Sequence, residues 1–483
     1  MKNCKPKYAI ITNYKIILFI FLFAAMGCFK FQTTKLPIHP SQLNFPQLKF
    51  TPPKPERYEL NNGMVVYFMP DHEIPLITIY ALTRCGDVYE PDDKVGLAGI
   101  CGKVMRTGGT KFLEPEEINE KLEYVAASVE SSIGRESGLV SLSVLKKDIN
   151  LGMEIFSQTL RHPKFRQDKI DLAIAQSIES IRRRNDDPMD IASREFKKLI
   201  YQNDPRARVA SIKGMKTIER DDLIEYHNQY FFPNNIILGV SGDFVIEEFL
   251  DTLSKYFGDW EYRDDKIPPP AVPKANNQKF VIYAERPLTQ STIISGHLTV
   301  PKTHPDYYSF KVLNFIIGGG GFNSYLMRDI RSNRGLAYSV GSFYRAEPEY
   351  GVFGAYCLTK SSTTAQVIDL MNNILKQIKN KGVSLEELKW AKDSIINQFT
   401  FSFESSNGLV EKYIGLEYDK YPKDYLKTYC THIEKVTLDD ISRVAVKYLD
   451  LQNSSLVVVG NNKDFDESLK KFGKVIEADL SIF

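Results

Sequence analysis

One stretch of this chain occurs twice, and the repeat constrains the fold more than any other feature of the sequence. The first copy, IERDDLIEYHNQYFFPNNIILGVSGD, begins at Ile218, and the second copy, VTLDDISRVAVKYLDLQNSSLVVVGN, begins at Val436. Each copy predicts a helix that starts at an acidic pair, then a short loop and an apolar strand. Aligned without a gap, the copies share identical residues at Asp221 and Asp439, Asp222 and Asp440, Tyr230 and Tyr448, Asn235 and Asn453, Leu238 and Leu456, Val240 and Val458, and Gly242 and Gly460.

This repeat favours a chain built from two similar domains, because equal loop lengths and a shared glycine are hard to reconcile with chance similarity. A chain of 483 residues is also too long for one ordinary core. The segment YRDDKIPPPAVPKANNQ holds three consecutive prolines among charges, which is typical of a linker. We therefore predict an N-terminal domain over residues 57–262, a linker over 263–278 and a C-terminal domain over 279–483.

Local patterns fill in the first domain. The segment YELNNGMVVYFMPD predicts two strands joined by an Asn-Gly turn. Apolar periodicity predicts helices over residues 116–127, 148–159, 167–184 and 189–201.

The N-terminus has the layout of a secretory signal. Four lysines precede the apolar stretch IILFIFLFAA, which is too short to span a bilayer comfortably, and the sequence MGC follows. A small residue and then a cysteine resemble a bacterial lipoprotein processing site, although Ala25 stands where leucine is usual. We predict a signal peptide over residues 1–28, lipidation of Cys28 and a proline-rich tether over 29–56. The chain would then be an exported lipoprotein of the cell envelope, held to a membrane by its lipid; plain cleavage or an uncleaved anchor are the alternatives.

Composition excludes some classes of function. The chain has 62 basic and 60 acidic side chains, and its net charge of +2 gives no footprint for a nucleic acid. No C-x-x-C pair occurs among the six cysteines, so zinc knuckles and thioredoxin chemistry have no support. We expect Cys85, Cys101, Cys357 and Cys430 to be buried thiols.

The segment VGLAGICGKVMRTGG, residues 95–109, is unusual because it reads as a helix interrupted by glycine. Gly96, Gly99 and Gly102 recur at every third position along an apolar face. Each glycine inside a helix costs about 1 kcal/mol relative to alanine. Their presence therefore asks for a reason other than helix stability.

A segment of the second domain carries a family resemblance. GGGGFNSYLMRDIRSNRGLAYSV, residues 318–340, resembles the second half of pitrilysin- and insulinase-type zinc peptidases, especially their half-size, mitochondrial-processing-type subunits. The resemblance extends from Tyr58 to about Asn462. It implies an α+β fold of two duplicated α/β-roll domains, each with a mostly antiparallel sheet and packed helices.

The same resemblance explains the glycines. Active members carry H-x-x-E-H, which places two histidines and a glutamate on one helical face to hold and use zinc. Here Gly99, Gly102 and Lys103 stand at those positions, and the family's third ligand falls at Glu179 or Ser180. At most one carboxylate survives, whereas a catalytic zinc usually needs three protein ligands. No two of the seven histidines are three or four residues apart, so we expect this chain to bind no metal.

Arg334 and Tyr338 match an arginine–tyrosine pair that, in the family, reaches the zinc site of the opposite half. The resemblance implies that they contact the substrate carbonyl and the developing oxyanion. The chain would then be inactive alone and would pair with a homologous subunit that supplies the zinc motif, the two closing on an extended peptide. A non-enzymatic peptide-binding or scaffold lipoprotein is the alternative, and a self-sufficient metallopeptidase is the least favoured of the three.

Overall fold

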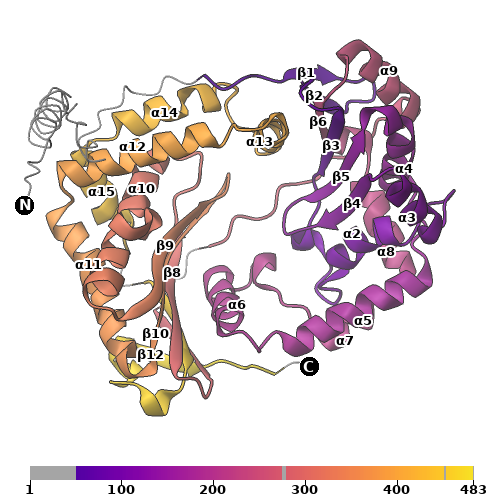
Figure 1. The fold of residues 1–483 in the computed structure, drawn as a ribbon. Coiled ribbons are helices and arrows are strands. Elements are labelled where there is room, and N and C mark those ends of the chain that lie inside the picture. Colours follow the sequence, from indigo (N-terminus) through magenta and orange to yellow (C-terminus); the bar gives the residue numbers. More distant parts are fainter. Residues whose placement is uncertain (1–50, 275–278, 451–452, 482–483) are drawn as a thin grey trace, which may run out of the picture. The chain divides into compact units, whose positions relative to one another are not determined.

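The structure is a computed structural model that describes residues 51–274, 279–450 and 453–481. The predicted signal peptide, Cys28 and nearly all of the tether lie outside these residues. The described chain forms two six-stranded mixed sheets, each packed with helices (Figure 1). This confirms the predicted α+β class with a duplicated domain.

The first sheet has the strand order β1-β2-β6-β3-β5-β4. Only β2 and β6 run parallel, and the other neighbours are antiparallel. Its strands are β1 (Glu56–Glu59), β2 (Val65–Pro70), β3 (Leu76–Thr83), β4 (Ser128–Ile133), β5 (Gly138–Leu145) and β6 (Ile236–Gly242). The helices of this part of the chain are α2 (Leu97–Thr107), α3 (Pro115–Tyr124), α4 (Ile149–Arg161), α5 (Gln167–Arg183), α6 (Pro188–Tyr201), α7 (Ile212–Met215), α8 (Arg220–Tyr230) and α9 (Ile246–Phe257).

The second sheet repeats this topology, with the order β12-β7-β11-β8-β10-β9. The parallel pair β7 and β11 corresponds to β2 and β6, and only the edge strands β1 and β12 have no counterpart. Its strands are β7 (Phe280–Glu285), β8 (Gln290–Thr299), β9 (Ala337–Ala346), β10 (Gly351–Lys360), β11 (Ser455–Gly460) and β12 (Lys474–Glu477). Its helices are α10 (Tyr307–Asn314), α11 (Thr364–Lys381), α12 (Leu385–Phe401), α13 (Ser406–Tyr418), α14 (Tyr425–Lys435) and α15 (Leu438–Tyr448), with π-helical turns η6 (Phe315–Gly319) and η8 (Met327–Asn333).

The repeated sequence is the pair α8–β6 in the first domain and α15–β11 in the second. Both helices begin with a capping box, formed by Glu219 with Asp222 and by Thr437 with Asp440. The shared acidic pair therefore stands at the helix N-terminus in both copies, as the sequence predicted. The domain boundaries at residues 57, 262 and 279 stay predictions.

Three of the four expected thiols, Cys85, Cys101 and Cys357, are fully buried, and Cys430 is half-buried. The predicted helices of the first domain appear as α3, α4, α5 and α6, and no end is shifted by more than three residues. Such shifts are ordinary for helix ends.

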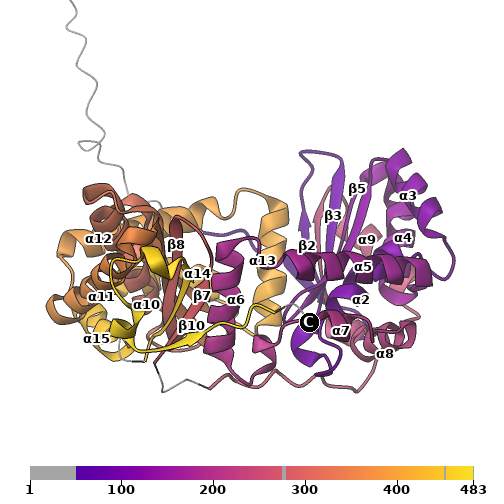
Figure 2. The same ribbon diagram turned by 90° about the horizontal axis from the view of Figure 1, so that it is seen from below.

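The two domains exchange one helix each, which the sequence did not indicate. α6 packs its apolar side, including Ile191 and Phe196, on the second sheet against residues such as Ile294 and Val457 (Figure 2). α13 in turn packs on β2, β3 and β6 of the first sheet. Each sheet thus has its own helices on one face and a single helix of the other domain on the opposite face.

Glycine permits the close approach of α13 to the first sheet. An added Cβ at Gly239 of β6 would lie 2.3 Å from Cγ1 of Val410 on α13, closer than real side-chain contacts come. Polar contacts complete this interface, since Glu417 accepts hydrogen bonds from Tyr67 at 2.8 Å and from Arg57 at 3.0 Å. The exchange is therefore fixed by both packing and charge.

Gly239→Ala should destabilise the protein by about 1–3 kcal/mol, because the added methyl overpacks the contact with Val410. In the double variant Gly239→Ala/Val410→Ala the clash is removed, so urea denaturation should reveal a favourable coupling of about 1 kcal/mol or more. Gly415→Ala on α13, where nothing lies within 4 Å of the new methyl, is the matched control and should not destabilise. A Gly239→Ala protein as stable as the parent would contradict the packing described for α13.

Candidate functional site

The helix α2 carries the positions that the sequence resemblance matches to the zinc motif, and the three glycines of this segment have different surroundings. Gly96, at its N-cap, has φ of 111°, a conformation that favours glycine. Gly99 is exposed and has nothing within 4 Å of an added Cβ. Gly102 is buried, and a Cβ there would lie 2.3 Å from the backbone nitrogen of Ile133 at the end of β4. No side chain fits at Gly102 unless α2 and β4 move apart.

A hydrogen-bonded serine holds α2 against β4 at this place. Ser131 of β4 donates its hydroxyl to the carbonyl oxygen of Gly102 at 2.6 Å. The same oxygen of Ser131 accepts the backbone N–H of Arg106 at 3.1 Å. The close contact at Gly102 is therefore part of the packing of this helix, and it excludes the glutamate that active family members carry there.

The remaining motif positions do not form a ligand set. Lys103, which aligns with the second histidine of the motif, donates a hydrogen bond to the side-chain oxygen of Gln176 on α5. The same helix carries Glu179. Glu179 on α5 instead pairs with Arg183 at 2.8 Å and Arg182 at 3.4 Å. The hydrogen bond from Arg183 is the main cause of the lowered pKa of Glu179. The exposed carboxylate is thus engaged within its own helix.

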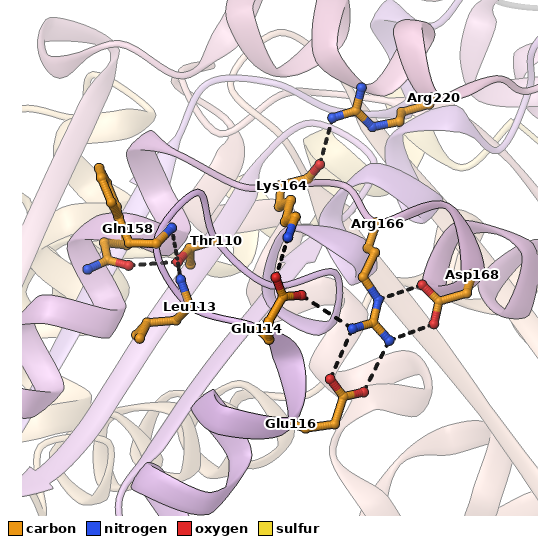
Figure 3. A network of polar contacts seen from close by, with 10 residues as sticks. Thr110, Leu113, Glu114, Glu116, Gln158, Lys164, Arg166, Asp168 and Arg220 are labelled. Carbon is orange, nitrogen blue, oxygen red and sulfur yellow. Dashed lines mark hydrogen bonds and ion pairs between the residues drawn. The ribbon is translucent and has the colours of Figure 1, made fainter.

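A surface network of charged side chains joins α3 to the start of α5 (Figure 3). Arg166, just before α5, pairs with Asp168 at 2.6 Å and with Glu116 at 3.0 Å. Its backbone N–H also bonds the carbonyl oxygen of Gly108, the residue after α2. Hydrogen bonds from Lys169 and Arg166 are the main side-chain causes that lower the pKa of Glu116 to about 2. The start of α5 is therefore held to α3 by ion pairs and to the end of α2 by a backbone hydrogen bond.

The side chains present do not fit a catalytic zinc. Glycine offers no donor atom, and the ammonium of Lys103 would repel a dication. Across residues 51–274, 279–450 and 453–481, no group of three or more histidine, cysteine, aspartate or glutamate side chains is arranged to hold a metal ion. We therefore derive no step of a reaction through a metal on this chain.

Arg334 and Tyr338 lie on the second domain, where η8 leads into β9. The side chain of Arg334 is 49% exposed, and its Nε lies 3.9 Å from Asp329. Tyr338 is 78% exposed. The guanidinium of Arg331 lies over the rings of both Tyr338, at 5.7 Å, and Phe322, at 5.3 Å. Within the described residues, no hydrogen bond or ion pair joins Arg334 or Tyr338 to α2 or α5.

A large cavity lies where elements of both domains meet, and sequence reasoning missed it. It encloses about 1080 Å³ between the start of α2, the β4–β5 turn, α6 and the strands β8, β9 and β10. Gly99 lines it, but Gly102, Lys103, Arg334 and Tyr338 do not. Its lining residues are scattered over the sequence from Asp87 to Tyr356, so no local motif could have indicated it.

Glu90 is a buried carboxylate in the wall of this cavity. It is 5% exposed, and its oxygens accept the backbone N–H groups of Gly96 at 2.9 Å and Ala98 at 2.6 Å. Burial raises the pKa of Glu90 to about 7, and these two hydrogen bonds only partly oppose the rise. Glu90 thus caps α2 while it titrates close to neutral pH.

Comparison with known proteins defines the class. Residues 74–210 match the family model "Insulinase (Peptidase family M16)", and residues 217–395 match "Peptidase M16 inactive domain". The chain belongs to peptidase family M16.

Relatives cover most of the chain at low identity. The "Non-peptidase homolog YmxG" of Helicobacter pylori is 24% identical over 422 residues, which cover 84% of this chain and 94% of that protein. The "Uncharacterized zinc protease YmxG" of Bacillus subtilis is 22% identical, with 74% of this chain and 86% of that protein covered.

Solved structures share the fold. An M16 inactive domain from Pseudomonas fluorescens superposes with a TM-score of 0.76 and 20% identity, covering 84% of this chain and 98% of the other. The periplasmic protease PqqL from Escherichia coli gives a TM-score of 0.72 and 14% identity, and the match covers 89% of this chain but 49% of PqqL. In the part of the chain that the structure describes, no helix is long and apolar enough to cross a membrane.

Alanine at the two motif glycines of α2 should have opposite effects. Gly99→Ala should stabilise the protein by up to about 1 kcal/mol, because the site is open and alanine favours the helix. Gly102→Ala should destabilise it by about 1–3 kcal/mol, because the methyl meets the backbone of β4. Urea denaturation of both variants checks this, and equal effects would show that α2 does not pack on β4 as described.

Glu90 should make the protein less stable as the pH rises from about 4.5 to about 7. Over this range the unfolded chain loses the Glu90 proton while the folded chain retains it, so stability falls by up to about 3 kcal/mol, fully expressed above pH 7. Urea denaturation of the parent and Glu90→Gln at pH 5, 6, 7 and 8 measures the difference. The amide loses an acceptor at every pH, so a constant offset is expected along with the altered slope. Parallel stability curves would show that Glu90 does not titrate as described.

Proposed function

We propose that this chain is the non-catalytic subunit of a zinc metallopeptidase of family M16. It would pair with a homologous chain that bears H-x-x-E-H and would contribute Arg334 and Tyr338 to peptide binding and oxyanion stabilisation. The zinc and the general base would both belong to the partner. The chain by itself would bind no metal and cleave no peptide.

The observation that carries this proposal is the contact at Gly102. If only the ligand side chains had been replaced, space for them could remain. At Gly102, however, α2 packs so closely on β4 that no volume is left for a glutamate. Lys103 is meanwhile bonded to α5. This supports a chain that no longer performs metal chemistry while it keeps the fold of the family.

The exposure of Arg334 and Tyr338 supports their action on a second molecule. An arginine fork and a phenol are suited to hydrogen bonding a peptide carbonyl, and tyrosine and arginine are over-represented among the residues that dominate binding. Phe322, 66% exposed, lies beside them under the guanidinium of Arg331. We call Phe322, Arg331, Arg334 and Tyr338 the Arg/Tyr surface. Its side chains remain accessible and need no rearrangement to meet a partner.

Length and relatives agree with a paired enzyme. The match covers about half of the Escherichia coli protease PqqL, so a second chain of similar size would complete a molecule of that length. The name of the Helicobacter pylori relative, a non-peptidase homologue, supports the loss of catalysis. We further propose export to the cell envelope with a lipid on Cys28, in keeping with the periplasmic description of PqqL.

The test combines this chain with a zinc-bearing M16 chain from the same organism. Alone, the purified chain should contain no stoichiometric zinc and should not cleave quenched fluorescent peptides, while the mixture should cleave them in a chelator-sensitive manner. Arg334→Ala and Tyr338→Phe in the mixture should each lower kcat by about 10²-fold, the loss typical of one oxyanion donor. Tyr124→Phe, at a 90% exposed tyrosine of the first domain, is the control and should leave kcat unchanged.

The outcomes separate the candidate functions. Chelator-sensitive activity of the isolated chain would overturn the proposal in favour of a self-sufficient peptidase. A mixture whose activity is unaffected by both variants would favour the scaffold function, in which the Arg/Tyr surface only binds a protein. Metal analysis of the isolated chain decides the first point independently of any substrate.

A further inference from the structure

The interdomain cavity is lined by more cations than its own acids neutralise. Arg135 comes from the β4–β5 turn, Lys197 from α6, and Arg345 from β9. No carboxylate oxygen of the described residues lies within ion-pair distance, 4.0 Å, of any of the three side chains. Arg135 and Arg345 instead stack on Tyr201 and Phe343, at 5.8 and 5.3 Å. Three cationic groups from three elements therefore face one space without an ion-pair partner.

The other charged groups of the cavity are already engaged. Arg194 pairs with Glu195 at 3.2 Å, and Arg208 pairs with Asp92 at 2.9 Å. Glu90 accepts the amides of α2, and Glu136 accepts a guanidinium at 2.7 Å and a phenol at 3.2 Å. Glu347 lies 3.8 Å from a lysine ammonium. These pairs cancel one another and leave the three cations largely uncompensated.

Asp87 is a carboxylate of the cavity wall that interacts with two of the three cations, Lys197 and Arg135. Burial raises its pKa, while the charges of Lys197 and Arg135 lower it. The pKa of Lys197 is lowered by burial and then by the charge of Arg135, so these two cations repel one another. Two acids, Asp87 and Glu90, against three bases leave an excess of positive charge, which an added anion would relieve.

We propose that this cavity binds a carboxylate group of an extended peptide, either an acidic side chain or a free C-terminus. The inference rests on the proposed function and adds the class of peptide that this chain would bind. Arg135, Lys197 and Arg345 would hold the carboxylate of that peptide by charge-assisted hydrogen bonds. The cavity of about 1080 Å³ is at the upper end of the range for ligand sites, so it has room for several residues.

Aromatic side chains in the walls suit the apolar part of such a peptide. Tyr201 and Tyr350 meet edge to face at 5.8 Å, and Phe196 and Phe343 do so at 6.1 Å. In each pair the first residue belongs to α6 and the second to the other domain, where Phe343 lies on β9 and Tyr350 directly precedes β10. The cavity therefore has rigid aromatic walls that combine with a cationic lining, as peptide recognition requires.

The turn that carries Arg135 is fixed in place. The carbonyl oxygen of Arg135 accepts the backbone N–H of Val88 at 3.2 Å, and the carbonyl oxygen of Gly134 accepts the backbone N–H of Asp87 at 3.0 Å. A Cβ at Gly86 would lie 2.2 Å from the same Arg135 oxygen, so the two segments are in the closest contact that glycine allows. Arg135 is therefore held over the cavity from a preformed backbone, which limits the entropy lost on binding.

Binding to the isolated full chain tests the proposal without a partner or a peptidase assay. Fluorescently labelled peptides of about ten residues, long enough to cross the cavity, are compared by anisotropy. One has central glutamates and blocked ends, one has glutamine in their place and blocked ends, and one has glutamine and a free C-terminus. The acidic peptide, the free-terminus peptide or both should bind at least about tenfold more tightly than the blocked neutral peptide. The arm that binds identifies the source of the carboxylate.

Single substitutions connect binding to the cavity. Arg135→Gln, Lys197→Gln and Arg345→Gln should each weaken the carboxylate peptide about tenfold and leave the blocked neutral peptide unchanged. Lys389→Gln on α12, an exposed lysine outside the cavity, is the matched control. Raising the salt from about 0.05 M to about 0.5 M should weaken binding to the parent more than to Lys197→Gln.

Equal affinities for all three peptides, or no binding of any peptide at about 1 mM, would overturn the proposal. An equal loss in Lys389→Gln would do the same, since the effect would then be one of total charge. These outcomes are distinct from failure of the proposed function, because a chain can bind carboxylate peptides whether or not it forms a peptidase with a partner.

Discussion

The structure depends on one constraint: each sheet has two apolar faces, and each domain covers only one of them with its own helices. The other face is covered by a helix of the opposite domain, α6 on the second sheet and α13 on the first. Burial of these faces is the main source of stability in a fold of this kind. The domains are therefore joined by these two helices as well as by the linker. Removing either α6 or α13 would expose one face of a sheet to water.

This exchange also creates the features on which function depends. Because α6 crosses to the second sheet, Tyr201 meets Tyr350, and Lys197 lines the same cavity as Arg345. The zinc-motif helix α2 starts at the same cavity, where its backbone amides are capped by Glu90. The Arg/Tyr surface lies apart from the cavity and stays exposed. Peptide binding within the chain and contact with a partner can therefore be separate properties of the molecule.

Local features of the sequence were sufficient to predict the duplicated units. The acidic pairs at Asp222 and Asp440 cap their helices, and the apolar runs that follow form β6 and β11, because capping and burial of a central strand need only neighbouring residues. The absence of zinc ligands at Gly99, Gly102 and Lys103 stays a prediction from the resemblance. What the sequence could not show is why Gly102 is glycine, since the answer lies in the backbone of β4.

The helix exchange and the cavity could not be predicted for the same reason. α6 has an ordinary amphipathic pattern, which shows the side that is buried but not the sheet that buries it, and α13 has almost no amphipathic pattern at all. Arg135, Lys197 and Arg345 are far apart in the chain, and each alone resembles a solvated surface charge. The segment predicted as a linker also holds fixed contacts, since its Pro268 and Ala271 carbonyl oxygens accept bonds from Tyr89 and Arg206 of the first domain.

The contact at Gly102 has a counterpart in the second domain. A Cβ at Gly318 in η6 would lie 2.4 Å from the backbone nitrogen of Ser342 on β9, just as one at Gly102 would meet that of Ile133 on β4. In both repeats the helical segment that follows the strand β3 or β8 therefore packs against the edge strand, β4 or β9, with no side chain between the two backbones. At this point the first repeat has the same solution as the second, which in this family carries no zinc motif. A zinc motif at Gly99, Gly102 and Lys103 would therefore need a displaced edge strand in addition to three new side chains.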